Sequence, residues 1–191
     1  MSLKLLKCLK FSLLIFALLY TGPAFCQEYK VNADEYFQLG VSYGQTGKFD
    51  KSAEVFKKLA VDLPNNPKIH FFLGKSYLSL EKLDLAKEEL NKALALDANL
   101  YYAMDDLATI NLIEQKYDQA KALLEKSIAL APKNYIAYYN LGLVFIGLND
   151  LPQAKNQCEI LKKLNPKAAE LLEGAIKEGK LSGKHVVVTG K

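Results

Sequence analysis

A unit of thirty-four residues occurs four times in this chain without an insertion or a deletion. Steps of thirty-four residues back from Gly142 reach Ala108, Gly74 and Gly40, which have at most a methyl side chain. A fixed period of this length is typical of arrays in which each unit packs only against its neighbours. The period therefore predicts an elongated array of stacked units.

Each unit contains two apolar stripes at helical spacing. With residues 33, 67, 101 and 135 as position one, the first stripe occupies positions four, seven and eleven, and the second occupies positions twenty, twenty-four and twenty-seven. Spacings of three, four and seven residues place side chains on one face of an α-helix. Positions eight and twenty carry Gly, Ala or Ser, as two closely crossing helices require. Each unit is therefore predicted to be a pair of antiparallel amphipathic helices.

These positions resemble the tetratricopeptide repeat family. Its pattern has a large aromatic residue at position four, Leu and Gly at seven and eight, Tyr at eleven, Ala at twenty, an aromatic residue at twenty-four and Pro at thirty-two, and the four units keep much of it. The departures are Ala98 at position thirty-two, and Ala108 and Asn111 in the third unit. The resemblance implies an all-α, right-handed superhelix (α-solenoid) with four repeats at residues 33–66, 67–100, 101–134 and 135–168.

The first twenty-six residues have the character of a secretory signal peptide. Three lysines precede an apolar run at residues 11–20, and Ala24 and Cys26 are small residues just before Gln27. A run of about ten residues is shorter than the roughly 20 that cross a bilayer. We expect residues 1–26 to be removed on export, which leaves a periplasmic or secreted protein without a membrane span. Retention as a membrane anchor and lipid attachment at Cys26 are the alternatives.

Removal of this segment changes the composition that bears on partners. The formal net charge falls from +4 to +1, and the chain has no arginine and no tryptophan, which disfavours nucleic acid as a partner. The remaining cysteine, Cys158, stands at position twenty-four among apolar residues, so we expect a buried thiol. An exported domain without disulfides fits a bacterial envelope better than a eukaryotic extracellular space.

Short segments flank the four units. Residues 27–32 form a leader, and residues 169–180 are predicted to be an amphipathic capping helix that covers the last apolar face. Residues 181–191 contain a short β-prone run. We expect this tail to be disordered, with docking on the array or on a partner as the alternative.

The sequence contains no constellation of catalytic or metal-binding residues. His70 stands at position four, where aromatic residues pack, and His185 lies in the tail; neither has cysteine or carboxylate neighbours at ligand spacing. Adjacent acids such as Asp105 and Asp106 point about 100° apart on a helix, so they cannot act on one substrate atom. We expect a protein that is not an enzyme and has no cofactor or metal.

The first helices are predicted to be apolar on nearly all sides. Positions two, five, nine and twelve lie opposite the packing stripe and are largely apolar, whereas the second helices have polar outer faces. In the resembling family the first helices line the concave wall, so we predict a peptide-binding groove there, with Lys68, Lys75 and Asp105 setting the ligand's polarity. Packing of one first helix against the next is the alternative. The predicted groove consists of Phe37, Val41, Phe71, Lys75, Leu78, Tyr102, Asp105, Thr109, Leu112, Tyr139, Leu143 and Ile146.

Two functions fit this sequence best, ahead of a carrier of small ligands, for which an enclosed pocket is expected, and of an enzyme. The first is a protein–protein interaction scaffold that binds a peptide or helix of a partner in the predicted groove. The second is a structural or assembly subunit, lipid-anchored or not, of a bacterial envelope complex such as a pilus, a secretion apparatus or an outer-membrane biogenesis machine. A permanent complex favours the second function, and transient binding favours the first.

Overall fold

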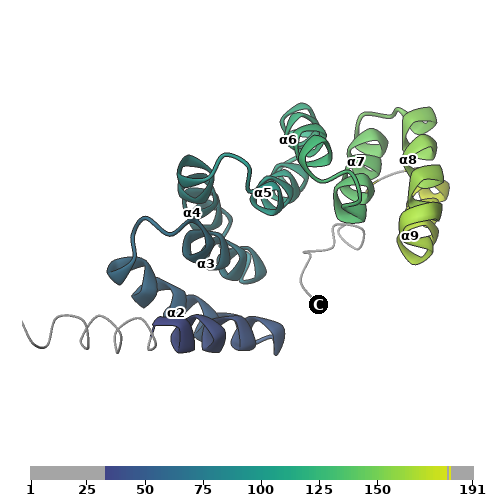
Figure 1. Cartoon of the computed structure of the whole chain (residues 1–191). Coiled ribbons are helices and arrows are strands. Elements are labelled where there is room, and N and C mark those ends of the chain that lie inside the picture. The colour runs from purple at the N-terminus through teal and green to yellow at the C-terminus, as the bar shows by residue number, and fades with distance from the viewer. Residues whose placement is uncertain (1–32, 180, 182–191) are drawn as a thin grey trace, which may run out of the picture.

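The computed structural model describes residues 33–179 and 181, and this part of the chain contains nine helices and no strand. The helices follow one another in single file. The first helices α3, α5 and α7 lie along the inner side of an arc, and the second helices α4, α6 and α8 lie along its outer side (Figure 1). This arrangement confirms the predicted all-α solenoid. The helices span residues 33–45, Phe49–Asp62 (α2), Pro67–Ser79 (α3), Leu83–Leu96 (α4), Tyr101–Ile113 (α5), Tyr117–Leu130 (α6), Tyr135–Gly147 (α7), Leu151–Leu164 (α8) and Pro166–Glu178 (α9).

Some of the predicted segments lie outside the described residues. These are the signal peptide at residues 1–26, the leader at 27–32 and the tail apart from Leu181. Of the helices that the structure describes, none is both long enough and apolar enough to cross a bilayer.

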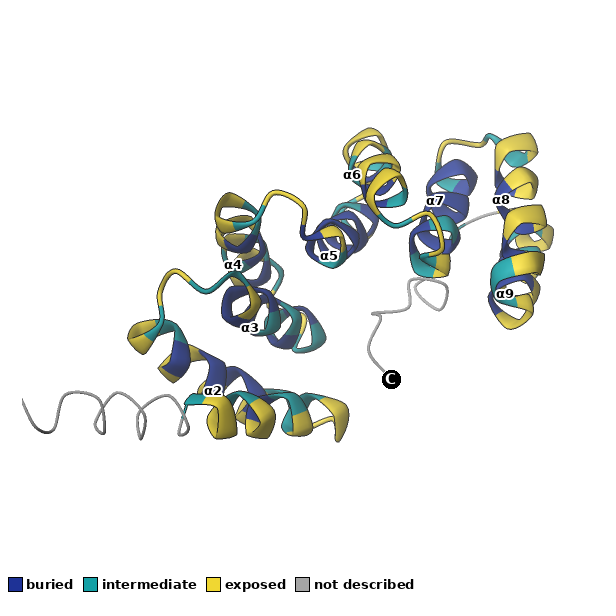
Figure 2. Ribbon diagram, in the orientation of Figure 1, coloured by how far each residue is buried: buried dark blue, intermediate teal, exposed yellow. Residues whose placement is uncertain are grey.

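The apolar core is divided into clusters that follow the order of the chain. One cluster joins the 33–45 helix to α2 and α3, a second joins α3, α4 and α5, and a third joins α5 to α9. Figure 2 shows buried residues where neighbouring helices face each other and exposed residues on the outer sides of the second helices. The stability of the fold is therefore a sum of local contacts between neighbouring helices.

The two helices of a unit approach closely at position eight. A Cβ added to Gly40 would lie 2.8 Å from carbons of the Phe56 ring, and one added to Gly74 would lie 2.8 Å from Leu90 Cγ. Phe56 and Leu90 both occupy position twenty-four and are fully buried. Glycine at position eight therefore leaves room for a large residue on the second helix.

The fourth unit is closed by α9 instead of by a large residue at position twenty-four. Cys158 stands at that position, is buried, and its Sγ lies 3.4 Å from the carbonyl oxygen of Ala169 on α9. The space over Gly142 is filled by Leu172, also on α9. The expected burial of Cys158 is thus observed, and α9 covers the end of the array as a capping helix.

The bounds of α9 differ from those predicted. The helix begins at Pro166 instead of residue 169, because Asn165 Oδ1 accepts a hydrogen bond from Ala168 N at 3.1 Å and Pro166 fits the first turn. It ends at Glu178 instead of residue 180, because Gly179 adopts a left-handed conformation with a φ of 66°.

The turn between first and second helix has the same backbone in all four units. The N–H at position sixteen donates to the carbonyl at position eleven at 2.7 to 2.9 Å, which forms a Schellman motif. Position fifteen then has a positive φ, and it is Gly47 in the first unit but Glu81, Gln115 and Asn149 in the others. A left-handed conformation costs a residue with a Cβ roughly 1–2 kcal/mol.

Replacement of Glu81 by glycine is expected to raise the free energy of unfolding by about 0.5 to 1 kcal/mol, because relief of the left-handed Cβ outweighs the entropy that glycine adds to the unfolded chain. Chemical denaturation measures this difference. The matched control is Lys82→Gly, which should lose stability because Lys82 has a φ of −85°. A destabilised Glu81→Gly variant would contradict the expectation.

Candidate functional site

The predicted groove residues fall into two groups in the structure. Eight of the twelve are buried, with at most 7% of each residue exposed, which contradicts the predicted exposed wall. The eight are Phe71, Leu78, Asp105, Thr109, Leu112, Tyr139, Leu143 and Ile146. The other four remain partly exposed: Phe37, Val41, Lys75 and Tyr102.

Consecutive first helices pack side by side and cover part of the buried group. The Phe71 ring on α3 contacts the Tyr102 ring on α5, with centroids 4.4 Å apart. In the next pair, Asn140 Nδ2 on α7 donates to Thr109 Oγ1 on α5 at 3.2 Å. A helical wheel shows which side of a first helix faces away from its own second helix. It does not show that the next first helix covers that side.

Asp105 is a buried carboxylate on the first-helix face. It is 4% exposed, and its Oδ2 accepts a hydrogen bond from Asn134 Nδ2 at 2.6 Å. Burial raises the pKa of Asp105 above its ordinary value, while hydrogen bonds from Ser127 and Asn134 act in the opposite direction. Asp105 therefore bonds within the array, and its predicted role in setting a ligand's polarity is not supported by its position.

His70 is part of the packing at position four, as expected. It is 7% exposed, its Nδ1 lies 2.6 Å from Glu89 Oε2, and its Nε2 lies 2.7 Å from the carbonyl oxygen of Pro64. Both ring nitrogens are therefore engaged by groups of the protein. His70 ties α3 to α4 and to the preceding turn.

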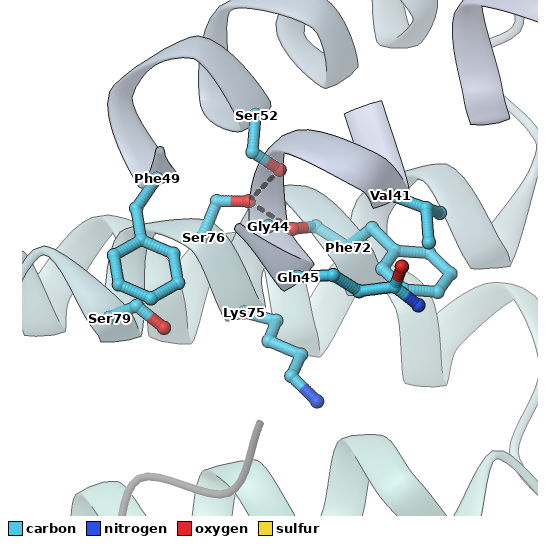
Figure 3. A pocket seen from close by; sticks show the side chains of 9 residues that line it. All are labelled: Val41, Gly44, Gln45, Phe49, Ser52, Phe72, Lys75, Ser76 and Ser79. Carbon is cyan, nitrogen blue, oxygen red and sulfur yellow. Dashed lines mark hydrogen bonds between the residues drawn. The ribbon is translucent and has the colours of Figure 1, made fainter. Parts of the chain in front are cut away.

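A pocket of about 390 Å³ lies between the 33–45 helix, the start of α2 and α3. Figure 3 shows Phe49 and Phe72 on opposite sides of it, with Lys75 extending away from Ser52 and Ser76. These two serines are at most 4% exposed and form its floor. The residues that line the pocket are Val41, Gly44, Gln45, Phe49, Ser52, Phe72, Lys75, Ser76 and Ser79.

Three oxygen–oxygen contacts hold the floor of the pocket together. Ser52 Oγ and Ser76 Oγ are 2.9 Å apart. Ser52 Oγ also lies 2.9 Å from the carbonyl oxygen of Gly40, and Ser76 Oγ lies 2.7 Å from that of Phe72. The floor thus connects both first helices with α2.

The pocket exists because position twelve is glycine in the first unit. The other units carry Leu78, Leu112 and Ile146 there, each buried at 4% exposure or less in the cores that join consecutive helices. A Cβ added to Gly44 would meet only Ser52 Oγ within 4 Å, at 3.4 Å, outside its own helix turn. The space is therefore open to a side chain that this unit lacks. The glycine at position twelve is visible in the sequence, but the pocket that results from it can be inferred only once the packing of the other three units is known.

The Asp105→Asn variant is expected to have a higher free energy of unfolding than the wild type at pH 7, because the amide does not have to carry a charge in a buried position. Because the pKa of Asp105 is raised in the folded protein, the protonated carboxyl group contributes to the free energy of unfolding, and this contribution is complete below about pH 3.8, the ordinary pKa. The contribution is lost as the pH rises through the pKa of Asp105 in the folded protein. The difference between the two proteins should therefore grow with pH. Urea denaturation at several pH values from 3 to 8 measures it. A difference independent of pH would mean that Asp105 does not carry a shifted titration.

Solved structures with the same architecture include those of two proteins, MamA and PilF. A crystal structure of the MamA protein is 28% identical in sequence to this chain and superimposes with a TM-score of 0.65. The match covers 77% of this chain and 81% of MamA. A structure of PilF from Pseudomonas aeruginosa has 22% identity and a TM-score of 0.65 over 81% of this chain and 79% of that chain, and it supports the fold alone.

The sequence comparisons point to the same kind of repeat. A curated relative, the Sol locus transcriptional repressor of Clostridium acetobutylicum, is 34% identical over 79 residues, which are 41% of this chain and 25% of the relative. This chain thus spans about a quarter of that protein's length. Family models described as tetratricopeptide repeat match residues 33–60, 67–100 and 111–176. Together with the stacked helix pairs, these matches show that the chain belongs to the tetratricopeptide repeat family.

Proposed function

We propose that this protein binds a peptide or helix of a partner protein on the first-helix face of its first two units. Tetratricopeptide repeats are generally non-catalytic scaffolds for protein–protein interaction. The observation that supports this face is the pocket between the 33–45 helix and α3, because the equivalent positions between the later first helices are filled by the chain's own side chains.

A row of aromatic rings extends from this pocket across three first helices. The ring centroids of Phe37 and Phe72 are 5.3 Å apart, those of Phe72 and Phe71 are 5.0 Å apart, and those of Phe71 and Tyr102 are 4.4 Å apart. Phe37 and Tyr102, at the two ends of the row, are partly exposed. Fixed aromatic rings supply apolar contact area at a low cost in side-chain entropy, which favours peptide binding.

A photoreactive phenylalanine analogue at Phe37 or Tyr102 is expected to cross-link to a discrete partner protein in intact cells. The control places the same analogue at Lys57, which is exposed on α2 and outside the first-helix face. Mass spectrometry of the cross-linked bands identifies the partner. Equal cross-linking from Lys57 and from the two face positions would contradict binding at this face.

We also propose that the protein is exported and acts in a bacterial envelope. The proposal rests on the lysine-rich start, the apolar run and the small residues before Gln27. Mass spectrometry of the protein isolated from cells is expected to find Gln27 at its amino terminus. A lipid-modified Cys26 at the terminus would identify the anchored alternative, and an intact residue 1 would contradict export with cleavage.

The structural-subunit alternative predicts a different behaviour of the same exported protein. A subunit of an envelope assembly remains bound to its complex through gel filtration without cross-linking, whereas a peptide-binding scaffold separates from its partner on dilution. Gel filtration of solubilised envelopes, with and without cross-linker, distinguishes the two functions.

A further inference from the structure

The geometry points to one kind of occupant for the pocket: a leucine, isoleucine or phenylalanine side chain of a partner peptide, with a carboxylate on the adjacent residue. This inference deepens the proposed function and rests on it, since it specifies the chemistry that the partner presents.

The later units show which side chain fits. Leu78, Leu112 and Ile146 are at most 4% exposed at the position where the first unit has Gly44. An aliphatic or aromatic side chain from a partner would lie between the Phe49 and Phe72 rings. Full burial of such a side chain removes a large apolar surface from water, which suits a single anchor residue.

The floor of the pocket accepts an apolar group without leaving a buried donor unsatisfied. Ser52 and Ser76 have one hydroxyl proton each, and their acceptors are each other's Oγ and the carbonyl oxygens of Gly40 and Phe72. An occupant therefore does not need to supply an acceptor, and the penalty for covering an unpaired polar group does not arise.

The charge at the rim selects the neighbouring residue. Lys75 is the charged residue among the nine that line the pocket, and no carboxylate lines it. Its Nζ lies 5.8 Å from the centroid of the Phe71 ring, which does not neutralise its charge. Position nine is uncharged in the other units, as Val41, Thr109 and Leu143. An acidic residue beside the anchor would therefore gain from Lys75, and a basic residue would be repelled.

Synthetic peptides with a central Leu-Asp between Gly-Ser flanks test the inference by NMR titration of the ¹⁵N-labelled protein to millimolar concentrations. The amide signals of Gly44, Ser52 and Ser76 are expected to shift. Leu→Ala in the peptide should weaken binding at least tenfold, because the buried side chain is lost. Asp→Lys should weaken it about threefold or more, because the rim contact is solvent-exposed. Equal affinity of the Asp and Lys peptides would overturn the charge selection.

Gly44→Leu is the decisive protein variant, because it places in the first unit the side chain that the second and third units already have. It should abolish peptide binding and leave the melting temperature unchanged or raised. Ser42→Leu is the matched control, since Ser42 is exposed on the same helix and does not line the pocket. Unchanged peptide binding by Gly44→Leu would overturn the pocket as the binding site.

Lys75→Glu supplies a second, independent test. It should reverse the preference between the Leu-Asp and Leu-Lys peptides, whereas Lys57→Glu on the exposed side of α2 should not. Failure of the wild-type protein to bind the Leu-Asp peptide, with cross-links at Phe37 and Tyr102 still formed, would overturn this inference while the proposed function stands. Absence of both would overturn the proposed function as well.

Discussion

The close approach of two helices at position eight is the contact on which the array depends. Where the first helix has Gly74, the second helix places Leu90 so near that an added Cβ would collide with it. The third unit keeps Ala108 there, and that residue is fully buried. The first two pairs close in this way, whereas in the fourth unit Leu172 of α9 lies over Gly142. The constant interval between the contacts presents each first helix to the same side of the arc (Figure 1).

This regularity determines how much of the structure follows from sequence. Helix pairs and their stacking are predictable because the same local requirements, a small residue at the crossing and apolar residues at helical spacing, are repeated four times. The exposed wall is not predictable in the same way. Whether Leu78 or Leu112 faces solvent depends on how far the next first helix extends over it, and a single helical wheel contains no information about a neighbour.

The end of the array and the candidate pocket illustrate the same limit on a smaller scale. The start of α9 depends on a cap at Asn165, and the closure of the fourth unit depends on Leu172 filling the space beside Cys158. The pocket depends on Gly44. A single glycine in a helix does not by itself indicate a pocket, and its meaning becomes clear only from the buried side chains at position twelve of the other units. Departures from a repeat are therefore easy to find in a sequence, but the packing of the regular units is needed to interpret them.

The serine pair has a consequence for how the pocket receives an occupant. Two hydroxyl protons serve three oxygen–oxygen contacts, so at most two of the contacts are hydrogen bonds at one time. Both hydroxyls can donate to their carbonyl oxygens, or one hydroxyl can donate to the other while the second donates to Gly40 or to Phe72. An apolar occupant leaves all three arrangements open, whereas an occupant with a donor group favours those that leave a lone pair of the contacted Oγ free.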